Sequence, residues 1–222
     1  MIDPKVKSAI ENALNAFTGY NEFDATATTD EFYEVFSSDE DFMTKVEEMD
    51  DVFDTYPAIE PLREVFFDML MVNFFSADVK KLEADYLDSA EWEAIEEDTL
   101  DRGTELLNVL LYLNECEDED IEPGLEDYLK EFLLVDEDEF QDEYRIYEPI
   151  IANQILIEGP VEDIAKVAEI LPEMSEIKEL FYPIMCFFQN TEPSDETLQM
   201  IADSSLDPEF DMAVMQILIN FK

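Results

Sequence analysis

Histidine is absent from this chain of 222 residues, and glycine occurs only four times. Without an imidazole there is no Ser-His-Asp or Cys-His nucleophile pair, no histidine acid–base catalysis and no histidine-ligated metal site. The few glycines are scattered, so the Gly-rich loops that hold phosphates, GxGxxG and GxxxxGK[ST], are both missing. These absences exclude most of the enzyme classes that a sequence motif can reveal.

Cysteine and long apolar runs are also scarce. Cys116 and Cys186 lie far apart with no CxxC spacing, which excludes a zinc ribbon and a dithiol redox motif. The first residues do not form a basic-then-apolar signal peptide, and no apolar run reaches the roughly 18 residues that a membrane span needs. We therefore expect a cytoplasmic protein that makes no contact with a membrane.

Positively charged residues are few in comparison with negatively charged ones. The chain has 12 Lys and Arg residues against 59 Asp and Glu residues, a formal net charge of −47. Hydrophobic residues still make up 47% and aromatic residues 12%, which is typical of a folded domain and not of a disordered chain. A surface this negative repels nucleic acids, nucleotides and anionic lipids. We expect no direct nucleic-acid binding, and a basic protein as the partner.

Apolar residues recur with helical spacing along nearly the whole chain, with no comparable strand alternation. This pattern predicts an all-α protein of about ten to twelve short helices in a single domain, 1–222. Residues 20–29 are expected to form a loop, and 137–157 a helix kinked at Pro149. Helix starts are indicated by Ser, Asp and Pro residues. These residues are Asp3, Pro4, Ser38, Asp41, Ser89, Pro123, Ser175, Ser194 and Pro208.

The helix starts in the second part of the chain have a regular spacing. Those at 89, 123, 160 and 194 are 34 to 37 residues apart, close to the period of α-solenoids. The spacing suggests an N-terminal subregion, 1–88, followed by stacked helical hairpins over 89–222. Because the tetratricopeptide signature residues are missing, an irregular multi-helix bundle is an equal alternative.

Acidic residues are densest between 115 and 148, where 16 of them face only Lys130 and Arg145. A calcium-binding EF-hand loop beginning at Asp118 would place Pro123 at the required glycine and Leu129 at the required glutamate, which excludes it. Carboxylate pairs of the kind that glycosidases use arise by chance among 59 acids, so they carry no specificity. We expect no metal, no cofactor and no enzymatic activity.

An electrostatic role explains the acidic runs better. Carboxylates at i and i+4 of a helix stand about 6 Å apart along the axis, similar to successive phosphates on one DNA strand. Glu115–Glu119–Glu122, Glu122–Glu126 and Glu139–Glu143 have such spacings, and acids between 93 and 101 could extend the same surface. The predicted partner-binding residues are Glu115, Asp118, Glu119, Asp120, Glu122, Glu126, Asp127, Asp136, Asp138, Glu139, Asp142 and Glu143.

In composition and charge alone, the chain resembles the DNA-mimic inhibitors that block restriction or other nucleases. That resemblance implies a non-enzymatic protein that occupies the cationic groove of a nucleic-acid-binding protein. The alternative is a helical-repeat interaction protein, which would act as a scaffold, an immunity protein or a chaperone for a basic partner. Adaptation to high salt also gives acidic surfaces, but the 17 Phe, 9 Tyr and 10 Met residues here argue against it.

Overall fold

The structure is a computed structural model that describes residues 1–20, 23–77, 89–136, 139–140 and 146–222. In these residues the chain is all-helical apart from one small hairpin, and its twelve α-helices confirm the predicted class and number. The helices are α1 (Pro4–Thr18), α2 (Thr26–Ser37), α3 (Phe42–Thr55), α4 (Arg63–Ala77), α5 (Ala90–Asp98), α6 (Leu106–Glu119), α7 (Leu125–Leu133), α8 (Glu148–Ala152), α9 (Val161–Ile170), α10 (Lys178–Gln189), α11 (Asp195–Ser204) and α12 (Pro208–Phe221). Two 3-10 helices, η1 (Pro57–Leu62) and η3 (Gln154–Glu158), and the strands β1 (Leu134–Asp136) and β2 (Glu139–Phe140) complete the described elements.

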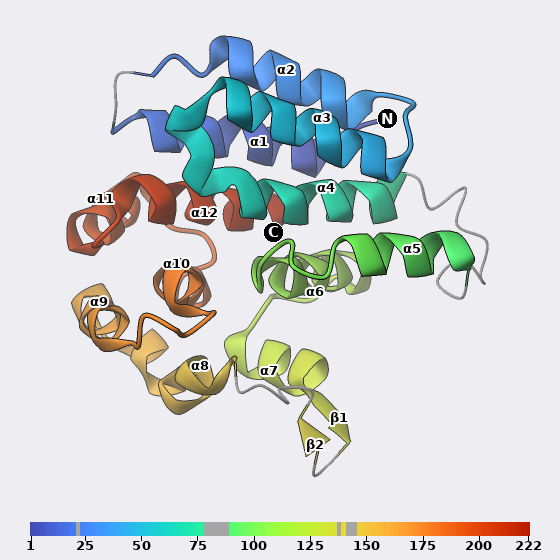
Figure 1. Cartoon of the computed structure of the whole chain (residues 1–222). Helices are drawn as coiled ribbons and strands as arrows, with labels where there is room; N and C mark the ends of the chain where they lie inside the picture. The colour runs from blue at the N-terminus through green and yellow to red at the C-terminus, as the bar shows by residue number, and fades with distance from the viewer. Residues whose placement is uncertain (21–22, 78–88, 137–138, 141–145) are drawn as a thin grey trace.

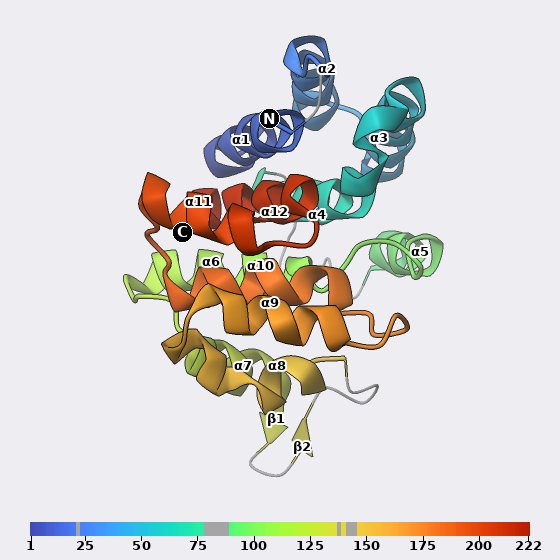
Figure 2. The same ribbon diagram turned by 90° about the vertical axis from the view of Figure 1, so that its left-hand side faces the viewer.

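The helices stack in layers (Figures 1 and 2). One end of the stack holds α1, α2 and α3, the middle holds α4 and α12 and then α6 and α10, and the other end holds α7, α8 and the hairpin. The first and last helices are neighbours, because α1 packs along α12 and Asn12 Nδ2 donates to Asn220 Oδ1 over 3.0 Å. An α-solenoid unit contacts only its neighbours in sequence, so the irregular multi-helix bundle describes this arrangement. The contact joins 1–88 to 89–222, whose division within one domain stays a prediction.

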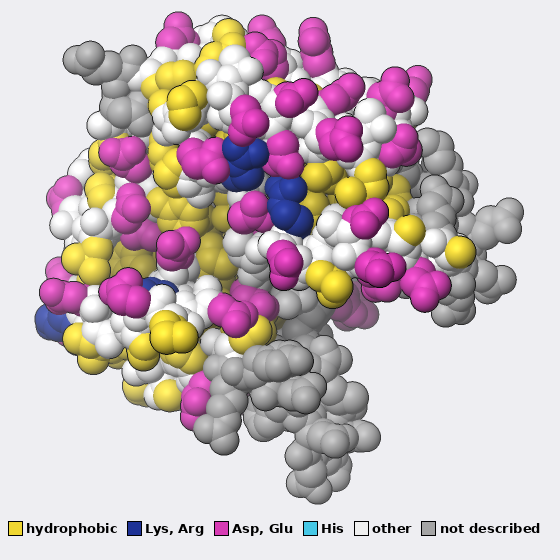
Figure 3. Space-filling model, in the orientation of Figure 1, with side chains coloured by type: hydrophobic (Ala, Val, Ile, Leu, Met, Phe, Trp, Pro, Cys, Tyr) yellow, Lys and Arg dark blue, Asp and Glu magenta, His cyan; other side chains and the backbone are white. Residues whose placement is uncertain are grey.

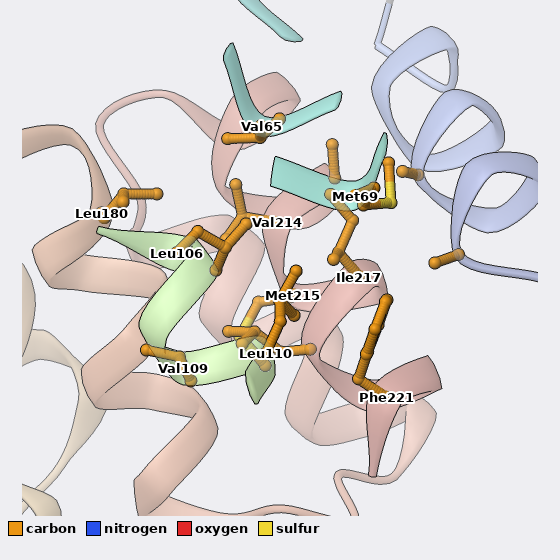
Figure 4. Close-up of a cluster of buried hydrophobic side chains, with 14 of the residues drawn as sticks. Val65, Met69, Leu106, Val109, Leu110, Leu180, Val214, Met215, Ile217 and Phe221 are labelled. Carbon is orange, nitrogen blue, oxygen red and sulfur yellow. The ribbon is translucent and has the colours of Figure 1, made fainter. Parts of the chain in front are cut away.

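The central core is built by four helices from distant parts of the chain. Figure 4 shows Val65 and Met69 of α4, Leu110 of α6, Leu180 of α10 and neighbouring side chains of α12 converging on one another. All of these side chains are buried. Burying apolar surface contributes about 25 cal/mol per Å², so this shared cluster fixes the position of α6 within the stack.

Side-chain caps explain where several helices begin. Asp3 accepts hydrogen bonds from the first turn of α1, Asp41 from Thr44 N at 3.0 Å, and Ser89 from Trp92 N at 3.1 Å. Ser194 and Asp207 cap α11 and α12 in the same way. Such caps satisfy backbone N–H groups that have no partner within the helix. The starts predicted at Asp3, Asp41, Ser89 and Ser194 are confirmed, and so is the start predicted at Pro208, which follows Asp207.

Three predicted segments were wrong. The loop over 20–29 ends earlier, because Asp24 accepts from Thr26 N and α2 begins there. In the described part of 137–157, residues 139–140 pair with 134–136 as a hairpin, and Pro149 lies in the first turn of α8, where a missing N–H costs nothing. The start predicted at Ser175 lies at Lys178 instead.

A charged network anchors the connection between α5 and α6. Arg63 and Arg102 both bind Asp50, each at 2.9 Å. The fully buried carboxylate of Asp68 accepts from Thr104 N at 3.0 Å and from the Thr104 hydroxyl, and its burial raises its pKa well above the usual range. These contacts hold the start of α6 against α4. Among the described helices, none combines the length and apolar character needed to cross a bilayer.

Candidate partner-binding surface

Seven of the twelve predicted carboxylates lie close together in sequence, at the end of α6, in the following turn and at the start of α7. Each is exposed to solvent. We define the acidic surface as these seven residues together with Glu117: Glu115, Glu117, Asp118, Glu119, Asp120, Glu122, Glu126 and Asp127.

The other five predicted residues do not add to this description. Asp136 belongs to β1 and Glu139 to β2, so they lie in the hairpin and not on a helix. Asp138, Asp142 and Glu143 lie outside the described residues. The predicted helical pair Glu139–Glu143 was therefore wrong, because its first member is in a strand.

The sequence of α6 separates its buried and exposed sides. Leu106, Leu110, Leu113 and Cys116 are spaced three or four apart and are buried, as expected for the inner face of a helix. Glu115 lies between Leu113 and Cys116, and three further acids follow Cys116 at 117–119. All four side chains face solvent. Packing of the apolar face against the central core thus presents the acidic surface on the outside.

The end of α6 has a defined geometry. Asp120 adopts the left-handed conformation, with φ 56° and ψ 44°. Ile121 N donates to Cys116 O at 2.9 Å, and Asp120 N donates to Glu117 O at 3.1 Å. These two bonds form a Schellman motif, in which glycine usually takes the left-handed position and aspartate is one of the few tolerated alternatives. The chain therefore turns sharply inside the acidic surface.

The buried side chain of Tyr112 anchors the backbone that follows this turn. Its hydroxyl accepts from Gly124 N at 2.9 Å and donates to Gly124 O at 3.1 Å. The ring is fully buried and packs against Tyr128 with a centroid distance of 5.3 Å. A buried tyrosine normally finds a partner for its hydroxyl, and here that partner is the backbone that leads into α7.

Two lysines from outside the 115–127 segment pair with the acidic surface. Lys5 Nζ lies 2.6 Å from Glu117 and also donates to Phe221 O at 2.9 Å. Lys222 Nζ lies 2.9 Å from Glu122 and 3.0 Å from Glu192. Both lysines are largely buried, whereas the glutamates are exposed. Lys5 of α1 thereby pairs with Glu117, which the list of predicted residues omitted although it lies within the acidic run.

The carboxylates do not form one helical stripe. Glu115 and Glu119 both lie on α6 with the i,i+4 spacing that was expected. Glu122 lies beyond the left-handed turn and before α7 begins at Leu125. Its predicted helical spacing to Glu119 and Glu126 was therefore wrong, and the turn divides the carboxylates into two groups.

The acids upstream of α6 form a separate group. Glu93, Glu96, Glu97 and Asp98 on α5, and Asp101 after it, are exposed. Figure 2 shows α5 at the opposite edge of the molecule from the labelled C-terminus, and Lys222 at that terminus contacts Glu122. The predicted extension of the acidic surface onto α5 was therefore wrong.

Two hollows open within the acidic surface. The first has a volume of about 190 Å³ and is lined by Glu117, Asp120 and Glu122 together with Lys222 and apolar residues. The second has a volume of about 590 Å³ and is lined by Glu117, Asp118, Asn114 and Lys5 among others. Glu117 borders both hollows, so the surface is concave on either side of this residue.

Most of the described Lys and Arg side chains form ion pairs with carboxylates of the same chain. Seven of the nine described Lys and Arg residues lie within 4 Å of a carboxylate: Lys5, Arg63, Arg102, Lys130, Lys166, Lys178 and Lys222. Of the other two, Lys45 is buried and Lys7 lies over the Tyr33 ring. Lys130 lowers the pKa of Glu126 at the start of α7. Figure 3 shows acidic side chains spread over one face, with few basic ones among them.

The described residues contain no group of three or more Cys, Asp or Glu side chains placed to hold a metal ion. What the arrangement offers is a fixed, concave and negatively charged surface. No family model, curated protein or solved structure matches this chain.

Proposed function

We propose that the protein is a non-enzymatic binding protein whose acidic surface occupies the cationic groove of a basic, nucleic-acid-binding protein. The observation that carries the proposal is the rigid setting of the acidic surface. The Schellman turn at Asp120, the Tyr112 bridge and the two lysine pairs fix exposed carboxylates around two hollows. Carboxylates that are already positioned lose little entropy on binding, which favours affinity.

The net charge supports the same function. A charge of −47 steers a basic partner toward the protein and raises the association rate. Like charges at i,i+4, such as Glu115 and Glu119, destabilise a helix by a few tenths of a kcal/mol. The retention of such destabilising pairs supports a function for them, and that function is electrostatic recognition of the partner. We expect the protein to act in the cytoplasm.

The test is a capture experiment from nuclease-treated lysate with the tagged protein, at rising salt and with competing duplex DNA. We expect capture of a nucleic-acid-binding protein that free DNA displaces. The triple variant Glu115→Gln/Asp118→Asn/Glu119→Gln should slow association on the order of tenfold at low salt. The difference should shrink toward 1 M salt, where the Debye length is about 3 Å.

A matched control makes the test specific for the acidic surface. Glu93→Gln/Glu96→Gln/Glu97→Gln on α5 removes the same charge from an exposed helix at the opposite edge. If both triple variants slow association equally, only the total charge matters and the proposed surface is wrong. Circular dichroism of both variants should match the unchanged protein, because all six side chains are exposed.

One observation favours a second function, that of a helical interaction protein that recognises its partner by shape. Ile155, Ile170 and Met174 expose 68%, 77% and 94% of their surface. Met174 also lines a hollow of about 500 Å³ with Pro149, Leu171 and Pro172. Capture of a basic partner that DNA does not displace, and that a Met174→Ser variant loses, would support the scaffold, immunity or chaperone alternative.

A further inference from the structure

A further cavity lies apart from the acidic surface and is lined by residues of α9, of α10 and of the turn and first residues that lead into α12. Figure 1 shows where these elements lie in the fold. Its volume is about 150 Å³. Its walls are mostly apolar, and three carboxylates and a lysine reach it: the lining residues are Ala165, Ala168, Lys178, Glu179, Tyr182, Leu206, Asp207 and Asp211. An apolar cavity of roughly this size holds a molecule as large as benzene, so it is large enough for the end of a long side chain.

Asp211 is the unusual member of this lining. Its side chain is only 5% exposed, and the Ser205 hydroxyl donates to its Oδ2 atom. Within the described part of the chain, no other hydrogen bond or ion pair to this carboxylate is formed. A buried carboxylate is costly without a positive partner. The burial raises the pKa of Asp211 to about 7.

The groups around Asp211 do not supply that positive charge. On α10, the ammonium of Lys178 is paired with Glu173, and Glu179 adds a further negative charge. The Tyr182 hydroxyl donates to Ile201 O at 2.7 Å, and burial raises the pKa of the Cys186 thiol so that it stays neutral. Glu162 of α9 and Asp207, which caps α12, are also negative, and Asp207 raises the pKa of Asp211 further.

We propose that this cavity binds an aliphatic cation, namely the end of a lysine or arginine side chain carried by the basic partner. The methylene groups would lie against Ala165, Ala168 and Leu206, and the cationic group would hydrogen-bond to Asp211. A cationic side chain buried in a pocket is the type of contact that dominates the affinity of an interface. That the cation belongs to a side chain of the partner rests on the proposed function. That the cavity binds an aliphatic cation does not.

Alkylammonium ions test the cavity without the partner. Methyl-, ethyl-, propyl- and butylammonium are titrated into the full chain, and binding is followed by NMR shifts of the methyl groups of Ala165, Ala168 and Leu206. Each methylene that is buried should tighten binding about fourfold, as its transfer free energy of about 0.8 kcal/mol predicts. Attraction to a surface of charge −47 alone would bind all four ions equally, and that result would overturn the proposal.

Two variants and pH separate the cation site from the apolar walls. Asp211→Asn should weaken butylammonium binding about tenfold, because it removes a charge-assisted hydrogen bond. Ala165→Met should block the cavity and leave the carboxylate intact, whereas Ala94→Met on an exposed position of α5 should change nothing. Binding should be tighter at pH 8 than at pH 6 and should release protons, because the bound cation favours ionised Asp211. Equal binding to Asp211→Asn would contradict the assignment.

The two proposals can fail separately. None of the residues of the acidic surface lines this cavity, so the triple variant of α6 should bind butylammonium normally. Ala165→Met should weaken capture of the basic partner from lysate. If butylammonium binds as expected but Ala165→Met captures the partner normally, the cavity takes a free amine and its assignment to a partner side chain is wrong. The test of the acidic surface is unaffected by that result.

Discussion

Replacing Asp211 by asparagine should stabilise the protein above neutral pH. The amide has the shape of the carboxyl group and can still accept the hydrogen bond from the Ser205 hydroxyl. The pKa of Asp211 is about 7 in the folded protein against 3.8 for an unperturbed aspartate, because its side chain is buried. Between these two values the folded protein holds a proton that the unfolded chain has released, so stability falls as pH rises.

The size of the effect follows from the same two pKa values. One pKa unit corresponds to about 1.36 kcal/mol, and most of the shift is crossed between pH 5 and pH 7. The unchanged protein should lose roughly 2–3 kcal/mol relative to Asp211→Asn between pH 5 and pH 8. Below about pH 3 Asp211 is protonated in both states, and the two proteins should be similarly stable. The buried carboxyl of Asp68 titrates in both proteins and cancels from the comparison.

Urea unfolding at pH 5, 6, 7 and 8, followed by circular dichroism, measures the difference. Glu169→Gln is the matched control, because Glu169 is exposed on α9 and its loss removes one charge without a change in burial. Relief of general charge repulsion would stabilise both variants equally at every pH. A stability difference between Asp211→Asn and the unchanged protein that does not grow with pH would refute the reasoning.

Three further results are expected. Gly103→Ala should lower the free energy of unfolding by at least about 1–2 kcal/mol in calorimetry, because Gly103 has φ +82° and a Cβ atom would lie 2.6 Å from Asp68 Oδ1; an unchanged melting temperature would contradict this. Tyr112→Phe should cost about 1–3 kcal/mol, since it leaves the N–H of Gly124 without the hydroxyl acceptor, whereas Tyr20→Phe at a 45% exposed position should cost little. The melting temperature should rise as sodium chloride increases from 10 mM to 500 mM, because salt screens the repulsion among charges that sum to −47; a fall over that range would contradict the expectation.

Local signals predicted the helices well where a side chain caps them. Asp41, Ser89, Ser194 and Asp207 each accept a backbone N–H at a helix start. Asp41, Ser89 and Ser194 were identified from sequence, and the start of α12 was identified from Pro208, which follows Asp207. The hairpin at 134–140 was missed, because its residues continue an apolar-and-acidic pattern that suits a helix equally well. A strand of two or three residues is too short for its alternation to be recognised.

The exposure of the acidic surface follows from the helical period, but its shape does not. The spacing of Leu110, Leu113 and Cys116 assigns Glu115 and the acids that follow Cys116 to the outer side of α6. The left-handed position at the end of α6 is occupied by Asp120 and not by glycine, so the sequence did not indicate a turn there. Helical spacings were therefore predicted across residues that the turn separates. The Lys5 and Lys222 pairs depend on packing between distant helices, which the pattern within one helix does not encode.

The packing of α1 along α12 has a consequence for how the chain folds during its synthesis. The apolar face of α1, with Val6, Ile10 and Leu14, is made first, yet the helix that covers it begins only at Pro208. During translation this face stays uncovered until nearly the whole chain has been synthesised, and contacts between residues so distant in sequence form slowly. A nascent chain halted before α12 should therefore keep α1 open to chaperones and proteases.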